Sequence, residues 1–250
     1  MELPDFTTQQ WGIAVLAALC AGFSKAGLAG LGTFTVMLMA QLIPGKASSG
    51  AVLPLLIAAD IMAAISFRQE ILWHHILRLA WPIMAGILLG CGVLLTMPDA
   101  AFRPVVGWMV LLMLAVQLWR LRYPAAAEGL PSSTGFVWFA GILTGASTMI
   151  ANAAGPVATV YLIMLALQKK EFISTMAWLF LFVNLSKVPF SYAMGLITVP
   201  SLTLNAALLP AVAVGLLAGR LCVNRIPQKA FQIIILSLCT LAAFRLILVP

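Results

Sequence analysis

The chain has 250 residues, of which 63% are apolar and only 8% are charged, and its formal net charge is +7. A soluble domain carries about 25% charged residues, so this composition excludes an ordinary soluble globular protein. Several runs reach the length of about 20 apolar residues that crosses a bilayer, which predicts an all-α polytopic membrane protein. The cations lie mainly in short loops without interleaved aromatic residues, so they indicate membrane orientation rather than nucleic-acid binding.

Eight apolar segments can be drawn along the chain. Two of them, 11–42 and 135–167, are too long for one straight span and are interrupted by glycine. The other six are 47–67, 79–97, 104–119, 172–194, 204–222 and 231–249. A polar stretch with proline and glycine, LRYPAAAEGLPSSTG, separates the two halves. We therefore predict one membrane domain made of a first repeat at 1–120, a linker at 121–134 and a second repeat at 135–250.

The two halves of the chain resemble each other. GIAVLAALCAGFSKAGLAGLGT (12–33) aligns without gaps on GFVWFAGILTGASTMIANAAGP (135–156), so that Gly22 meets Gly145 at an offset of 123 residues. Further on, GILLG (86–90) meets GLLAG (215–219) at an offset of 129 residues. An ordered series of such matches indicates an internal duplication, which is a mark of secondary transporters.

The distribution of cations distinguishes two membrane topologies. If all eight segments span the membrane, the best orientation places seven cations on one side and five on the other. If 11–42 and 135–167 are re-entrant hairpins, only Lys46, Arg103 and Arg245 lie opposite a group of nine. These nine are Arg68, Arg78, Arg120, Arg122, Lys169, Lys170, Arg220, Arg225 and Lys229.

The second distribution fits the positive-inside rule better. Each half then consists of one broken or re-entrant helix hairpin and three transmembrane helices. Because three is an odd number of spans, the second half is inverted relative to the first, which is the inverted-repeat arrangement. Both chain termini are then expected outside.

Each predicted hairpin contains two half-helices of about a dozen residues, each about 18 Å long, which places the break near the middle of the bilayer. The second half-helix begins there, and its free N–H groups and positive dipole end form an anion site. Gly155 is expected to cap this half-helix in front of Pro156, a residue suited to the first helical position. Gly32 and Thr33 are the repeat mates at the first break.

Two lysines lie within the hydrophobic segments. A lysine at the bilayer centre costs about 2.5–3.5 kcal/mol, so Lys25 in the first break and Lys187 in LFVNLSKVPFSYAMG are candidates for binding a negatively charged substrate. Asn184 falls on the same helical face as Lys187. Each lysine also has a plainer interpretation, in which Lys187 snorkels to a membrane interface and Lys25 reaches an exposed hairpin tip.

Asp60, in LLIAADIMAAIS, is the only acidic residue deep in a predicted span. It either carries or senses a proton, or it is the structural partner of Lys25 or Lys187. Its approximate repeat mate is Asn184, so both positions are expected to face a central cavity. Asn152 at the second break binds either an anion or a backbone carbonyl that the break frees.

No set of residues for enzymatic chemistry can be assembled from the seven acidic residues and two histidines. His74 and His75 lie in a predicted cytoplasmic loop without a third ligand nearby, so we expect no metal site. No nucleotide-binding motif indicates ATP-driven transport. We therefore expect no catalytic residue and no cofactor. The sequence neither indicates nor excludes a homo-oligomer.

The broken segment AGFSKAGLAGLGTFTVMLMAQLIPGKASSG and its counterpart TGASTMIANAAGPVATVYLIMLALQKKEFISTMAWLFLFVNLSKVPFSYAMG resemble the TauE/SafE sulfite exporter family of bacterial membrane permeases. AGILLGCGVLL and VGLLAGRLCVNRIP fit the same family, so the resemblance covers nearly the whole chain. It implies transport of sulfur-containing anions, such as sulfite or C2 and C3 organosulfonates. Lys25 departs from the family pattern, in which this break more often carries small uncharged residues. It therefore implies a distinct substrate or a fixed counter-charge.

The residues and this resemblance together predict a secondary transporter of the bacterial plasma membrane, expected to export a small sulfur-containing anion. Its expected partners are that anion and the lipid bilayer, and no nucleic acid. The expected anion-binding residues are Lys25, Gly32, Thr33, Asn152, Gly155, Asn184 and Lys187, with Asp60 as the residue for proton coupling. Three alternatives stay open, namely transport of another small anion or a carboxylate, a membrane-embedded enzyme, and a structural or assembly protein of the membrane.

Overall fold

The computed structural model describes residues 6–26, 32–43, 46–96, 129–152 and 154–227, together with single positions between 108 and 123 and between 230 and 244. Every regular element in this part of the chain is a helix, and no strand occurs in it. Four of the described helices are long and apolar enough to cross a membrane. The prediction of an all-α polytopic membrane protein is therefore confirmed.

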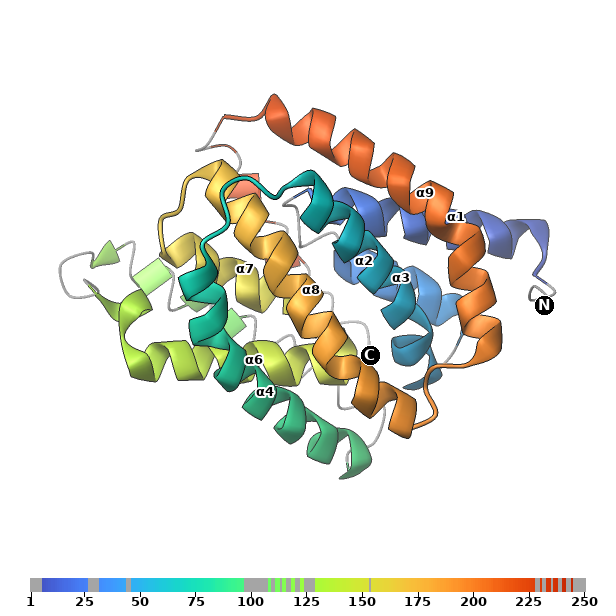
Figure 1. Cartoon of the computed structure of the whole chain (residues 1–250), viewed down its shortest axis with the longest axis horizontal. Coiled ribbons are helices and arrows are strands. Elements are labelled where there is room, and N and C mark those ends of the chain that lie inside the picture. The colour runs from blue at the N-terminus through green and yellow to red at the C-terminus, as the bar shows by residue number, and fades with distance from the viewer. Residues whose placement is uncertain are drawn as a thin grey trace.

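The described helices follow the predicted segments closely (Figure 1). They are α1 (Thr8–Ser24), α2 (Gly32–Leu42), α3 (Lys46–Ser66), α4 (Trp73–Thr96), the short 3-10 helix η2 (Leu130–Ser132), α6 (Thr134–Ala151), α7 (Ala154–Met164), α8 (Lys169–Ala193) and α9 (Val199–Asn224). The four candidate spans lie in α3, α4, α8 and α9. The predicted spans 104–119 and 231–249 lie mostly outside the described residues.

Each of the two broken segments folds into two helices that lie side by side. In the first, the Thr35 hydroxyl near the start of α2 donates to the Ala17 carbonyl oxygen in α1 at 3.2 Å. In the second, the Tyr161 hydroxyl near the end of α7 donates to the Pro131 carbonyl oxygen, just before α6, at 3.3 Å. Both contacts require the chain to reverse at the break. Both segments are therefore helical hairpins rather than straight interrupted helices.

The two arms of each hairpin differ in length. α1 and α6 have 17 and 18 residues, whereas α2 and α7 have 11 each. The prediction of about a dozen residues per arm is right for the second arms and wrong for the first arms. The first arms are about 26 Å long at 1.5 Å per residue. They are longer because Gly22 and Gly145 lie inside α1 and α6, where these glycines allow close packing and do not interrupt the helix.

Gly22 brings the backbone of α1 into direct contact with α9. A Cβ atom built on Gly22 would lie 2.0 Å from the Val212 carbonyl oxygen. From the other side, a Cβ atom on Gly215 would lie 2.2 Å from the Leu19 carbonyl oxygen. No side chain larger than hydrogen fits at either position, so small residues determine how closely these helices approach.

α4 and α6 cross in the same manner. A Cβ atom on Gly145 of α6 would lie 2.1 Å from the Ile83 carbonyl oxygen, and one on Gly86 of α4 would lie 2.3 Å from the Ile142 carbonyl oxygen. The offsets of 123 and 129 residues relate the two crossings contact by contact. The corresponding pairs are Gly22 with Gly145, Leu19 with Ile142, Ile83 with Val212, and Gly86 with Gly215. This correspondence supports the predicted duplication, while the inverted orientation of the two halves in a membrane stays a prediction.

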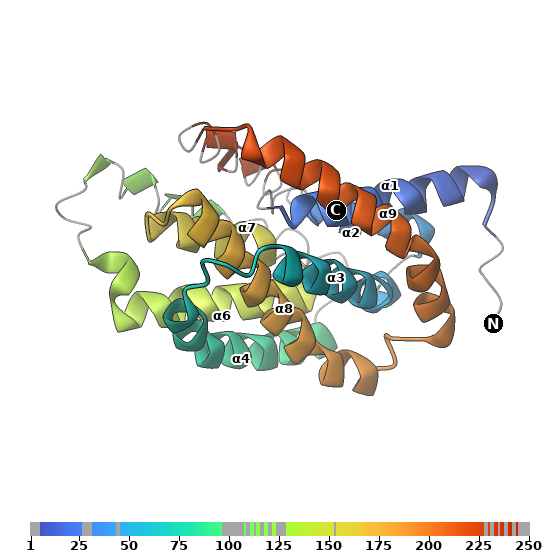
Figure 2. The same cartoon turned by 45° about the horizontal axis from the view of Figure 1, so that its top comes forward.

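The buried apolar side chains form two main cores, each built from helices of both halves. The first core joins α1, α2 and α3 to α9 and includes Ala17, Val52 and Leu208. The second core joins α6, α7 and α8 to α4 and includes Ile83 and Leu179. In both views the α1–α9 pair and the α4–α6 pair lie on opposite sides of α3 and α8 (Figures 1 and 2). α3 and α8 therefore meet where the two cores adjoin.

We expect Gly22→Ala to destabilise the protein by about 1–3 kcal/mol, because the added methyl group overpacks a backbone contact. Gly12→Ala is the matched control in the same helix, since nothing lies within 4 Å of a Cβ atom built on Gly12. It should be neutral or stabilising by up to about 1 kcal/mol, the difference in helix propensity between the two residues. Thermal unfolding of the detergent-purified variants measures both effects. Equal shifts in Tm would show that the crossing tolerates a side chain.

Candidate functional site

A small cavity of about 40 Å³ lies where the breaks of both hairpins meet α8. One water needs about 10–15 Å³, so the cavity has room for a few waters or a compact solute. The lining residues come from α1, α2, α3, α6, α7, α8 and the first residue after α1 and α6. They are Ser24, Lys25, Gly32, Leu56, Thr148, Asn152, Ala154, Gly155, Met176, Ala177, Phe180 and Asn184. Five predicted site residues are among them, namely Lys25, Gly32, Asn152, Gly155 and Asn184.

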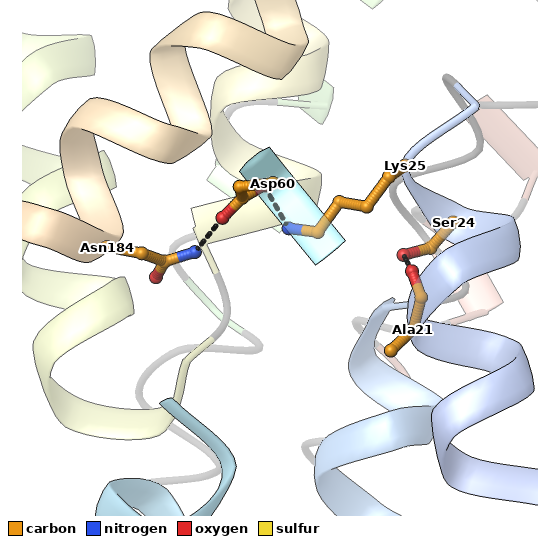
Figure 3. A network of polar contacts seen from close by, with 5 residues as sticks. All are labelled: Ala21, Ser24, Lys25, Asp60 and Asn184. Carbon is orange, nitrogen blue, oxygen red and sulfur yellow. Dashed lines mark hydrogen bonds and ion pairs between the residues drawn. The ribbon is translucent and has the colours of Figure 1, made fainter. Parts of the chain in front are cut away.

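Asp60 lies between Lys25 and Asn184 in a buried polar network (Figure 3). The Lys25 ammonium is 2.7 Å from Asp60 Oδ1, with side-chain exposures of 9% for Lys25 and 0% for Asp60. The Asn184 amide donates to Asp60 Oδ2 at 2.6 Å. The two predicted repeat mates, Asp60 and Asn184, are therefore in direct contact where α3 meets α8. This geometry matches one of the two predicted roles of Asp60, namely that of structural partner of Lys25.

Lys25 enters the cavity because α1 ends immediately before it. The Lys25 backbone N–H donates to the Gly22 carbonyl oxygen at 3.1 Å, and the Ser24 hydroxyl donates to the Ala21 carbonyl oxygen at 2.8 Å. These bonds satisfy helix-end carbonyls that would otherwise lack partners. The Lys25 ammonium also lies 4.9 Å from the centroid of the Phe180 ring, a cation–π distance. The Lys25 side chain is thus only 9% exposed, so its interpretation as a lysine at an exposed hairpin tip is wrong.

Lys187 is buried beside the cavity, with an exposure of only 1%. Its ammonium donates to Thr148 Oγ1 at 3.2 Å and contacts Asn152 Oδ1. Thr148 and Asn152 both line the cavity, whereas Lys187 lies behind them. Among the described residues, no carboxylate forms an ion pair with Lys187. Snorkelling to an interface is therefore wrong for Lys187, because its charge is held inside the protein by two neutral oxygens.

Asn152 terminates α6 and connects three parts of the site. Its backbone has φ 50° and ψ 29°, the left-handed conformation that asparagine tolerates better than most residues. Its side-chain amide donates to the Ser49 carbonyl oxygen at 2.9 Å and to Ser49 Oγ at 2.8 Å, while its Oδ1 contacts Lys187. Asn152 thus binds a backbone carbonyl, but this carbonyl belongs to α3, whereas the sequence predicts one that the break frees.

The starts of α2 and α7 both face the cavity. Gly32 is the first residue of α2, although as the repeat mate of Gly155 it is expected to cap this helix. α7 begins at Ala154, so Gly155 lies in its first turn and is not its cap. The predicted cap is wrong because α6 ends sharply at Asn152 and the next helix starts two residues later. The Thr33 side chain lies outside the described residues.

Two lining residues with clear contacts, Thr148 and Phe180, were missed by the sequence analysis. Thr148 is the repeat mate of Lys25 at the offset of 123 residues, so the alignment of the halves contained a signal for it. Phe180 lies four residues before Asn184 and shares its helical face. A polar residue one turn away was therefore the signal that could have identified Phe180.

The three buried charges of the site do not cancel. With both Lys25 and Lys187 protonated and Asp60 ionised, the described residues of the site contribute two positive charges and one negative charge, a net charge of +1. A buried charge without a counter-charge is unfavourable unless it is hydrogen-bonded or paired. The arrangement can therefore accept one compact monovalent anion and thereby become neutral.

Comparison with known proteins gives one finding. A family model described as Sulfite exporter TauE/SafE matches residues 14–246. The match includes every element that lines the cavity. No curated protein and no solved structure matches the chain.

A double-mutant cycle on Lys25 and Asp60 should reveal strong coupling. Lys25→Met and Asp60→Asn each leave a partner in the interior without its counter-charge, and breaking a buried pair in this way costs about 3–5 kcal/mol. The double variant should cost less than the sum of the two by at least about 1 kcal/mol, since neither charge remains. Thermal unfolding of the purified variants measures the cycle. Asn184→Ala, which removes the uncharged hydrogen-bond partner of Asp60, is the comparison variant. Strict additivity would contradict the ion pair.

Proposed function

Since the chain belongs to the sulfite exporter TauE/SafE family, whose members are membrane transporters and not enzymes, we propose that it exports sulfite or a small organosulfonate as a secondary transporter. The family implies a sulfur-containing anion as substrate and a lipid environment. The choice of substrate, the direction of transport and the coupling ion are parts of our proposal. The bacterial plasma membrane and the location of both termini outside are also parts of our proposal. The cation distribution of the sequence supports this orientation.

One observation carries the proposal, namely that the buried Lys187 ammonium is held by neutral oxygens alone within the described residues. A protein that only needed a stable interior would gain by replacing this lysine with an apolar residue of similar volume. An anion in the adjacent cavity would supply the missing negative charge. Lys187 would then act through Thr148 and Asn152, whose side chains it contacts and which line the cavity.

The first turns of α2 and α7 support the same site. Both helices start at the cavity, at Gly32 and Ala154, and helix N-termini present free N–H groups and a positive dipole end to a ligand. A sulfite or sulfonate group has several oxygens that can accept hydrogen bonds from different directions. Donors from two hairpins would bind such a group better than they would bind a spherical halide ion.

Sulfite should bind the wild-type protein more tightly than it binds Lys187→Met. We expect sulfite to raise the Tm of the purified wild type, because a ligand that binds only the folded state adds about 2.7 kcal/mol at one hundred times its Kd. Lys187→Met should lose at least tenfold in affinity. Arg68→Gln is the matched control, since Arg68 is an exposed cation that does not line the cavity.

The same variants should be compared for flux of labelled sulfite into proteoliposomes. A wild type that binds and transports acetate or chloride but not sulfite would favour the alternative of another small anion. Equal binding and flux by Lys187→Met and the wild type would overturn the proposed site.

We also propose that Asp60 couples transport to protons, by taking up a proton when the anion binds at Lys25 and releasing it when the anion leaves. Flux of a sulfonate, whose single charge is constant across neutral pH, should then depend on the pH gradient in the wild type. Asp60→Asn should abolish that dependence while sulfonate exchange without a gradient persists. A pH-gradient dependence that survives Asp60→Asn would leave Asp60 only its structural role. Arg68→Gln, at an exposed position that does not line the cavity, is the control.

A further inference from the structure

A second and larger cavity, a groove of about 830 Å³, lies on the face that the sequence assigns to the cytoplasm. It is formed where the loop after α3, the loop before α8 and the end of α9 come together. In Figure 1 these three chain segments lie together at the top of the molecule. The family match and the proposed site do not assign any role to this groove.

The charged residues that line the groove are mostly cations. Lys169, Lys170 and Arg220 contribute three positive charges and Glu70 one negative charge, a net charge of +2. Glu70 compensates little, because its contact with Lys170 is 3.8 Å long and the Lys170 side chain is 82% exposed. The Lys169 ammonium binds the Val223 and Ile226 carbonyl oxygens at the end of α9. The groove therefore has a positive potential with Lys170 and Arg220 at its surface.

The groove comes close to the central cavity along α8. Ile173 and Ser174 line the groove, whereas Met176 and Ala177 line the central cavity. Three residues of helix, from Ser174 to Ala177, correspond to about 4.5 Å along the helix axis. Residues within one helical turn of each other on α8 therefore line different cavities.

A small apolar cluster includes lining residues of both cavities. Its buried members are Ala63, Ala177 and Leu216, one each from α3, α8 and α9, and the partly buried Met62 and Phe67 pack against them. Phe67 also lines the groove, and the Arg220 guanidinium lies 5.8 Å from the centroid of its ring. We call Ala63, Ala177, Leu216 and Phe67 the apolar seal. Two of its three buried members are alanines, so the centre of the seal is formed by small side chains.

We propose that the groove is the inner mouth of the transport path, where Lys170 and Arg220 collect small sulfur-containing anions before they pass the apolar seal to the central cavity. This inference rests on the proposed function and names the surface through which its substrate enters. A cation-lined recess with apolar walls concentrates anions and raises their association rate by about tenfold or more. The seal prevents ions from leaking, because an apolar constriction is unfavourable for a hydrated ion.

One arm of the test blocks the groove. Ser66 lines the groove, so Ser66→Cys in a chain without Cys20, Cys91, Cys222 and Cys239 allows a bulky anionic thiol reagent to be attached there. Ser132→Cys is the matched control, because Ser132 is exposed and does not line the groove. Thiol modification of the Ser66→Cys variant should reduce sulfite flux in proteoliposomes at least tenfold, while the Tm increase caused by sulfite persists. Thiol modification of the Ser132→Cys variant should change neither.

The other arm needs no cysteine and uses the native chain. Lys170→Gln combined with Arg220→Gln should raise the KM for sulfite flux at least about threefold at low ionic strength. The difference should disappear at about 1 M salt, where the Debye length is only about 3 Å. Arg68→Gln, which removes a cation of the same loop that does not line the groove, should raise the KM less than the double variant does. The sulfite-induced Tm shift of all variants should match that of the wild type.

The outcomes separate the two proposals. Two outcomes would overturn the groove as the mouth but leave the central site. One is full sulfite flux after complete modification of the Ser66→Cys variant. The other is an unchanged KM in the variant without Lys170 and Arg220. If the unmodified wild type neither binds nor transports sulfite, the proposed function is overturned and this inference with it.

The flux assays should use vesicles of phosphatidylcholine alone and vesicles with added anionic lipid. A KM effect seen only with anionic lipid would identify the groove as a lipid-headgroup site and overturn the inference.

Discussion

The contact between Lys25 and Asp60 determines how the first hairpin sits in the molecule. A lysine and an aspartate in an apolar interior each carry a desolvation cost that only close pairing and further hydrogen bonds offset. The 2.7 Å contact joins the end of α1 to α3, and the Asn184 amide joins the same carboxylate to α8. The hairpin break is thereby held against the two central helices, and the cavity forms beside it. Because Asp60 compensates only one lysine, the charge of Lys187 remains as the excess that an anion can neutralise.

Much of this arrangement could be predicted from the sequence because charge and glycine are costly in membrane segments. The sequence analysis selected three charged residues because nothing in lipid could stabilise a charge. These residues, Lys25, Asp60 and Lys187, all lie in the interior next to one cavity. The offset of 123 residues between Gly22 and Gly145 was visible as a sequence match, and the structure gives both glycines the same kind of backbone contact. The outline of the helices followed from hydropathy alone.

The details that could not be predicted have a common physical cause. Lipid tails are as apolar as leucine, so hydropathy does not distinguish a helix face that packs in the core from one that faces lipid. In α4, Ile87 is fully buried and the adjacent Leu88 is 55% exposed, although their hydrophobicity is nearly the same. For the same reason Phe180 gave no signal of its own. Likewise, only the tertiary structure shows that Asp60 pairs with Lys25 and not with Lys187. The predicted lengths of the first hairpin arms were wrong. The reason is that a glycine that breaks a helix and a glycine that packs against a neighbouring helix look alike in sequence.

The backbone contacts at the glycine crossings have a mechanical consequence. Two helices whose main chains touch cannot slide past each other without a collision, so α1 moves with α9 and α4 moves with α6. We expect the described helices to move as two bodies, α1, α2, α3 and α9 in one and α4, α6, α7 and α8 in the other, each with its own main core. In the described part, the chain passes from one body to the other at 67–72, between α3 and α4, and at 194–198, between α8 and α9, where Gly195 has φ 68°. A line through these two crossover segments is the natural axis for rocking one body against the other, and the contact between Asp60 and Asn184 lies at the interface that such a rotation would shear.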